Sequence, residues 1–253
     1  NGYGQVQELL LLKKRLQEHP IDLLVLLFYF RNDFDDNLGT FDWIRLYERP
    51  RARVDTKGEL RIENQPDTPP TEMPGESRTA QQAGLTQSLA LCRLVNQAFD
   101  ACFPSVRPLH DQAPEVRFCR REYTKKEQEA LVLTKALIAE MKKTAEARNS
   151  RFAVVLAPSL WQIDSEKWSS LLHRIQLDEQ DFERNGPQQR LARICTDLGI
   201  PCLDLLPVFE EYAGRGENLY YPLETHWTAK GNQRAGEAIA DWLKENSLFQ
   251  AGR

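Results

Sequence analysis

Residues that bind metals are few in this 253-residue sequence and fall in no metal-binding pattern. It contains four histidines and five cysteines, and no two cysteines form a CxxC pair. Structural zinc sites need such closely spaced ligands, so we expect no metal site, and nothing indicates a cofactor. Cys92, Cys195 and Cys202 lie in apolar patterns typical of small core residues, whereas Cys102 and Cys119 are candidates for a disulfide. Because the number of cysteines is odd, they do not indicate whether the protein works in an oxidising or a reducing compartment.

Long apolar runs are also missing. The longest, residues 21–30, includes Asp22 and is far shorter than the roughly 20 residues that cross a bilayer as a helix. We therefore expect no membrane-spanning segment in this chain. The first residues, Asn1-Gly2-Tyr3-Gly4, resemble the interior of a domain and include no Met, so we interpret the sequence as beginning partway through a longer protein.

Neither sign of charge dominates. The chain has 33 Lys+Arg and 37 Asp+Glu, and its basic residues are scattered without interleaved aromatics. We therefore expect no nucleic-acid partner. With 41% apolar residues, the chain can bury a core of one α/β domain or two small ones.

Apolar patterns alternate between helical and strand periods along the chain. This order predicts a three-layer α/β/α sandwich with a mostly parallel sheet, similar to flavodoxin-like folds. The predicted strands are 22–30, 152–157 and 202–206, and the predicted helices are a first one that ends before Pro20, then 82–103, 125–148, 165–174 and 188–198, and a last one that follows Thr228.

The first predicted strand is apolar at every position from Leu23 to Phe30. Such a strand is typical of a parallel sheet that helices cover on both faces. It should also have hydrogen-bonded neighbours on both edges. We therefore expect that strands upstream of Asn1 are missing from this sequence.

An insertion is predicted at about 43–78. Two short strand-like pieces, 52–54 and 60–62, flank Thr56-Lys57-Gly58, and a proline-rich stretch follows at 66–74. This pattern indicates a hairpin and a loop beside the sheet. We expect residues 1–253 to form one domain that carries this insertion.

A carboxylate stands two positions before a histidine in the segment Glu224–Ala229. A fixed acceptor on one ring nitrogen of His226 would set the tautomer of the other and prepare the imidazole as a general base. Thr228 is a predicted N-cap, which places His226 on a loop at a helix entrance. The alternative is an ordinary loop histidine that bonds to a neighbour.

Polar residues 31–37 follow the first predicted strand. Open α/β sheets place their chemistry at this end of a strand. Asn32 is a candidate site residue here, or simply a turn residue that satisfies the loop backbone. Asp33, Asp35 and Asp36 could suggest a cation site, but we favour a solvated surface loop.

Three separated segments together resemble successive motif blocks of the SGNH (GDSL-type) hydrolases. They are Gly2-Tyr3-Gly4 running into Gln7-Glu8-Leu9-Leu10, Asn32-Asp33-Phe34 with Asp36-Asn37, and Glu224-Thr225-His226-Trp227-Thr228 with Gly231. The resemblance covers essentially the whole chain and implies hydrolysis of a small-molecule or glycan ester by a serine nucleophile.

The resemblance also implies residue roles. His226 would be the base and Glu224 the carboxylate that orients it. Asn32 and Gly2 would donate hydrogen bonds to the oxyanion, although Gly2 is alternatively a plain turn glycine. Donors aimed at a developing oxyanion contribute about 3–4 kcal/mol each.

The sequence departs from the family pattern at the nucleophile. No Gly-Asp-Ser block is present, and chain order would place it before Asn1; Gly75-Glu76-Ser77 follows the asparagine block and is rejected. Glu224 replaces the usual aspartate, and Arg31 replaces a glycine. We therefore expect the chain itself to be inactive. Two alternatives remain open: a polysaccharide O-acetyltransferase or deacetylase, and a non-catalytic binding domain.

Overall fold

A computed structural model describes residues 4–30, 32–39, 50–63, 114–221 and 226–248. The chain divides into two compact units, residues 1–65 with 114–253, and residues 66–113. The second unit lies outside the described residues, so the following description concerns the first. The expectation that residues 1–253 form one domain stays a prediction.

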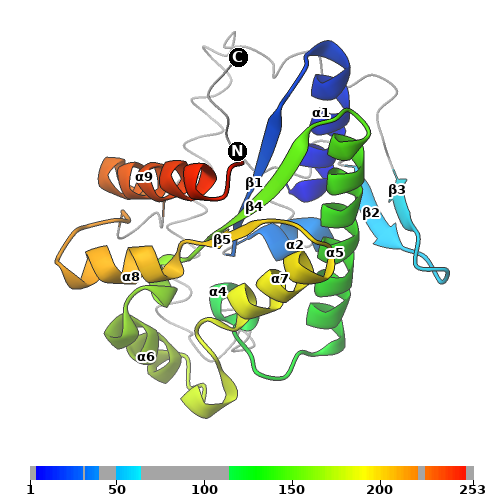
Figure 1. The fold of residues 1–253 in the computed structure, drawn as a ribbon. Coiled ribbons are helices and arrows are strands. Elements are labelled where there is room, and N and C mark those ends of the chain that lie inside the picture. The colour runs from blue at the N-terminus through cyan, green and yellow to red at the C-terminus, as the bar shows by residue number, and fades with distance from the viewer. Residues whose placement is uncertain (1–3, 31, 40–49, 64–113, 222–225, 249–253) are drawn as a thin grey trace, which may run out of the picture. The chain divides into compact units, whose positions relative to one another are not determined.

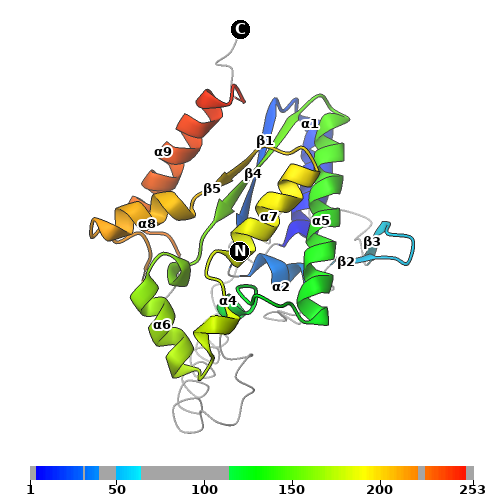
Figure 2. The same ribbon diagram turned by 60° about the horizontal axis from the view of Figure 1, so that its bottom comes forward.

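Three parallel strands form the main sheet in the order β1-β4-β5 (Figure 1). Helices α1, α5 and α7 lie on one side of it and helices α8 and α9 on the other (Figure 2). This arrangement confirms the predicted α/β/α sandwich with a parallel sheet. The bounds are β1 Leu23–Tyr29, β4 Arg151–Ala157, β5 Cys202–Asp204, α1 Gln5–Glu18, α5 Lys125–Glu146, α7 Gly186–Asp197, α8 Leu206–Gly214 and α9 Ala229–Glu245.

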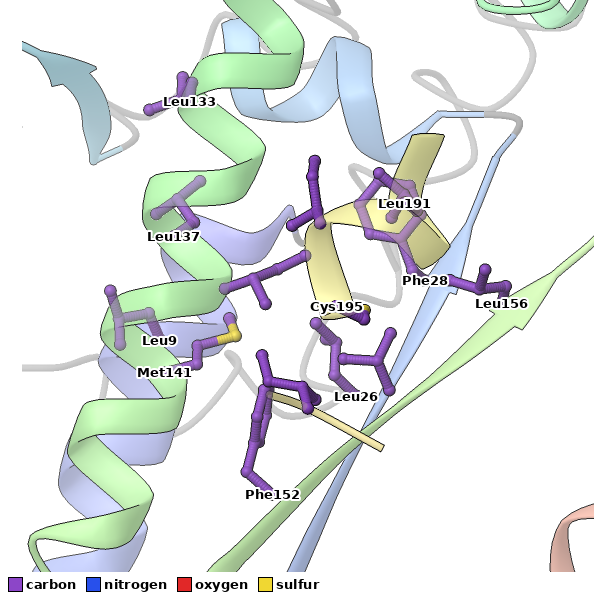
Figure 3. Close-up of a cluster of buried hydrophobic side chains, with 14 of the residues drawn as sticks. Leu9, Leu26, Phe28, Leu133, Leu137, Met141, Phe152, Leu156, Leu191 and Cys195 are labelled. Atoms are coloured by element: carbon purple, nitrogen blue, oxygen red, sulfur yellow. The ribbon is translucent and has the colours of Figure 1, made fainter. Parts of the chain in front are cut away.

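The larger core lies between the sheet and the layer of α1, α5 and α7. Alternate strand residues face it because side chains of a strand point to opposite sides in turn, and the helices contribute residues spaced three or four apart. Figure 3 shows these side chains meeting in one cluster, which includes Leu9, Leu26, Phe28, Leu133, Leu137, Met141, Phe152, Leu156, Leu191 and Cys195.

The opposite face of the sheet is covered unevenly. Val155 of β4 is fully buried against residues of α8 and α9 such as Phe209 and Ala235. Leu27 of β1, which pairs with Val155, is 42% exposed. The expectation that both faces of the first strand are covered is therefore wrong at Leu27, because α8 and α9 pack over β4 and β5 and leave this part of β1 open.

Two short helices replace parts of predicted loops or strands. The loop predicted at 31–37 contains helix α2, Asp33–Leu38, which ends at Gly39 with a positive φ of 65°. The strand predicted at 202–206 ends at Asp204, whose Oδ1 accepts a hydrogen bond from the Leu206 N–H at 2.9 Å as α8 begins. A side-chain acceptor two residues before the helix start explains this early strand end.

The predicted hairpin is present. Strands β2, Arg51–Val54, and β3, Leu60–Glu63, pair antiparallel around a turn that contains Gly58. The predicted helix at 82–103 lies outside the described residues. The remaining short elements are α4 Pro114–Arg117, the 3-10 helices η2 Leu160–Gln162 and η3 Glu179–Asp181, and α6 Ser165–Arg174.

Candidate active site

Asn32 lies three positions after Tyr29, the last residue of β1, and is the N-cap residue of α2. Its side chain is half-buried, and its Nδ2 donates a hydrogen bond to Asp36 Oδ2 at 2.5 Å. A primary amide has two N–H protons. The bond to Asp36 therefore fixes the side chain and uses one proton, so the second can serve another acceptor.

The acidic residues of α2 do not form a solvated surface. Asp33 and Asp35 are 6% and 2% exposed, so the sequence-based expectation for these two residues is wrong. Asp35 pairs with the guanidinium of Arg117. Asp33 Oδ2 accepts hydrogen bonds from the Tyr29 N–H and from Gln5 Nε2, both at 2.8 Å. Burial raises the pKa of Asp33 well above its ordinary value despite these donors.

The first turn of α1 packs against α2. A Cβ added to Gly4 would lie 2.8 Å from Asp36 Cβ, so only a glycine lets the two segments approach this closely. Glu8, one turn further along α1, is the third member of a carboxyl cluster with Asp33 and Asp36. Its Oε2 is buried without a hydrogen-bond partner, and burial raises its pKa to about 7.

The histidine segment is anchored at the carboxyl end of β4. Tyr220 pairs with Trp227 in an antiparallel bridge, and the Tyr220 hydroxyl donates a hydrogen bond to the carbonyl of Pro158, the residue after β4. Between them, the His226 carbonyl accepts a hydrogen bond from the Tyr221 N–H at 2.8 Å. The backbone of His226 is thus held while its side chain is exposed.

The helix entrance after His226 has the predicted cap. Thr228 Oγ1 accepts a hydrogen bond from the Gly231 N–H at 3.1 Å, which confirms Thr228 as the N-cap of α9. A Cβ on Gly231 would lie 2.2 Å from the carbonyl oxygen of Leu219. Gly231 therefore lets α9 start directly against the backbone of Leu219.

Asn32 and His226 are the two candidate residues that the structure describes, and both are connected to the edge of the sheet where the strands have their carboxyl ends. Asn32 follows β1, and His226 is tied to the end of β4, the neighbour of β1. Tyr29 at the end of β1 also lies close enough to Tyr220 to raise its pKa, in addition to the larger effect of burial. Gly2 and Glu224 lie outside the described residues, and all four assigned roles stay predictions.

Sequence reasoning missed Gln5 and Glu8, which contact this end of α2. A signal for Gln5 was present, because it stands four positions before Leu9 and so shares the apolar face of α1 that also carries Leu12 and Leu16. A polar residue in the register of a buried stripe indicates a buried hydrogen bond. Glu8 offers no comparable signal, since it is next to that stripe rather than in it.

Across the described ranges of the chain, no group of three or more histidine, cysteine or acidic residues could hold a metal ion. In the same ranges, every helix is too short or too polar to cross a membrane.

Comparison with known protein families identifies a relationship for this chain. The model of the family described as "SGNH hydrolase-like domain, acetyltransferase AlgX" matches residues 118–253, which is more than half of the chain. This range includes the histidine segment and β4. No curated protein and no solved structure matches the chain.

Proposed function

Because the chain belongs to this family of SGNH hydrolase-like domains, we propose that it carries out serine-dependent chemistry on carboxylic esters. The family match is the observation that carries this proposal. Two observations support it: Asn32 follows β1, and the segment that carries His226 is bonded through Tyr220 to the residue after β4, the neighbour of β1. Catalytic groups of open α/β sheets gather at this edge.

In the proposed mechanism, a serine encoded before Asn1 attacks the ester carbonyl, and His226 takes its proton. Glu224 orients the imidazole, while the Gly2 N–H and the second amide proton of Asn32 bind the oxyanion. The protonated imidazole then passes its proton to the leaving alcohol, and water releases the acyl group by the same steps. Removing one oxyanion donor should lower kcat by about 10²–10³.

The test compares the present chain with the same protein extended through its upstream sequence. The extended protein should hydrolyse a short-chain p-nitrophenyl ester, and His226→Ala should abolish the reaction. His173→Ala, an exposed histidine on α6, should not change it. The 253-residue chain should be inactive, so sustained hydrolysis by that chain, lost in its own His226→Ala variant, would contradict the proposed nucleophile.

A second candidate is acetyl transfer to, or removal of acetyl groups from, a polysaccharide. The description of the matching family, which names an acetyltransferase, favours it. An acyl-serine can react with a sugar hydroxyl in place of water, so the same residues would serve. Incubation with an acetyl ester donor and a glycan acceptor separates the two reactions, because transfer yields acetylated glycan and hydrolysis yields only acetate. If the upstream sequence holds no serine and neither product forms, the domain is a non-catalytic binding relative.

A further inference from the structure

Gln5 joins the two ends of helix α2 to the start of α1. It is the first residue of α1 and is fully buried. Its Nε2 donates a hydrogen bond to Asp33 Oδ2 at 2.8 Å, and its backbone N–H donates to Asn37 Oδ1 at 3.1 Å. One residue thus binds both the first and the fifth residue of α2.

The partners of Gln5 extend this network to two further elements. Asp33 Oδ2 also accepts the N–H of Tyr29, the last residue of β1, at 2.8 Å. Asn37 Nδ2 donates to Thr134 Oγ1 of α5 at 3.0 Å. Asn32 lies in the chain between Tyr29 and Asp33. Asp33 Oδ2, the oxygen that Gln5 contacts, also accepts the Tyr29 N–H, so the chain is held on both sides of Asn32.

We propose that Gln5 is a positioning residue that holds Asn32 in place relative to the start of α1. This inference rests on the proposed function, in which Asn32 and Gly2 donate to one oxyanion. Such donors must be held within about 0.5 Å of their productive geometry. The hydrogen bonds of Gln5 link α2 to the start of α1.

A role in packing alone does not explain glutamine at this position. Gln5 Oε1 is buried and has no hydrogen-bond partner. An unpaired buried oxygen is unfavourable for folding, and a methionine would fill a similar space without it. The Nε2 donor, in contrast, is the part of the Gln5 side chain that holds Asp33, and through Asp33 it also holds the preceding residue, Asn32.

The first experiment uses the 253-residue chain and the ¹H–¹⁵N correlations of the Asn32 side-chain amide, assigned by their loss in Asn32→Asp. Gln5→Met removes the donor and should move both amide signals toward the values of a freely exposed amide. Gln188→Met is the matched control. Gln188 is a buried glutamine that accepts a hydrogen bond from Gln162 at 2.8 Å, so its loss should lower stability without moving the Asn32 signals.

The variant Gln5→Glu provides a second test, because the Asn32 amide signals should then depend on pH in a way that a purely structural role of Gln5 would not cause. When protonated, its carboxyl can donate to Asp33 as the amide does. When ionised, it is repelled by Asp33 and by Glu8, which also bonds to the Gln5 side chain, with Asp36 nearby. The variant is therefore compared with wild type at each pH, because these three carboxyl groups are present in both. The Asn32 signals of this variant should resemble wild type in acid and Gln5→Met in alkali. Because Gln5→Glu keeps the donor in acid, it preserves the test if Gln5→Met does not fold.

The second experiment measures ester hydrolysis by the upstream-extended protein. Gln5→Met should lower kcat about a hundredfold, as for loss of one oxyanion donor, with KM within about twofold. The Gln5→Glu to wild-type ratio of kcat should fall as the pH rises.

Unchanged Asn32 signals in Gln5→Met, with a loss of stability like that of Gln188→Met, would overturn the inference. A complete lack of hydrolysis by the extended wild type would instead refute the proposed function, and the amide signals alone would then decide whether Gln5 positions Asn32.

Discussion

Replacing Glu8 with glutamine should stabilise the protein in alkaline solution and leave its stability in acid nearly unchanged. Burial raises the pKa of Glu8 from 4.5 to about 7, and the charge of Asp36 adds to this effect. Glu8 Oε2 is buried without a hydrogen-bond partner. The ionised carboxylate is therefore less favourable in the folded protein than in the unfolded chain.

The size and sign of the effect follow from the two pKa values. A group with a higher pKa in the folded state binds its proton more tightly there, so its stabilising contribution is complete below about pH 4.5 and is lost as the pH rises through about 7. At about 1.4 kcal/mol for each pH unit between these values, the loss is about 3 kcal/mol. Glutamine does not titrate and escapes this loss.

Urea unfolding followed by circular dichroism measures the effect. The unfolding free energy of Glu8→Gln should exceed that of wild type by about 3 kcal/mol at about pH 8.5 and agree within about 0.5 kcal/mol at about pH 4.5. Glu18→Gln is the control, because Glu18 is exposed on the same helix and pairs with Arg15 at 3.3 Å. Its effect should stay within about 0.5 kcal/mol at both pH values.

A stability difference between Glu8→Gln and wild type that did not depend on pH would refute a raised pKa of Glu8, and so would a variant that is less stable than wild type in alkali. The first result would mean that Glu8 is solvated well enough to ionise normally. Asp33 remains in both proteins, and its pKa is raised mainly by burial but also by the charge of Glu8. Removing that charge eases the ionisation of Asp33, so this coupling acts in the same direction as the predicted stabilisation in alkali.

Three glycines give further predictions, all measured by urea unfolding. Gly231→Ala should cost about 3 kcal/mol, since the new Cβ would lie 2.2 Å from the Leu219 carbonyl oxygen. Gly236→Ala, in the same helix with nothing within 4 Å of the new Cβ, should instead stabilise by about 1 kcal/mol; equal effects at both positions would show that crowding is not the cause. Gly4→Ala should cost about 1–3 kcal/mol because Asp36 must move away, and a change below about 0.5 kcal/mol would argue against close packing of α1 on α2.

Elements with local signals could be predicted from the sequence. Helix α6 has the predicted bounds 165–174, because Asp164 caps its first turn through the Lys167 N–H. In the same way, Thr228 caps α9 by accepting a hydrogen bond from the Gly231 N–H. The strand at 23–29 follows from its continuous apolar run. In each case, the residues that decide the structure are neighbours in the chain.

Features that depend on distant residues could not be predicted in this way. Acidic residues usually face solvent, but Asp33 is buried because Gln5, 28 positions earlier, supplies a donor. Similarly, the exposure of Leu27 depends on where α8 and α9 pack, which the pattern within β1 does not encode. The position of the His226 segment depends on the bond from Tyr220 to Pro158, 62 positions apart.

The pairing of β1 with β4 has a consequence for biosynthesis. Ser150, just before β4, donates a hydrogen bond to the Ile21 carbonyl, just before β1, across 129 positions of chain. At about 5–20 residues per second, a ribosome needs roughly 6 to 26 seconds to make the intervening segment. Throughout this interval the nascent Leu23–Tyr29 stretch lacks the sheet partner that β4 provides, so its apolar residues are exposed to aggregation until β4 has been made.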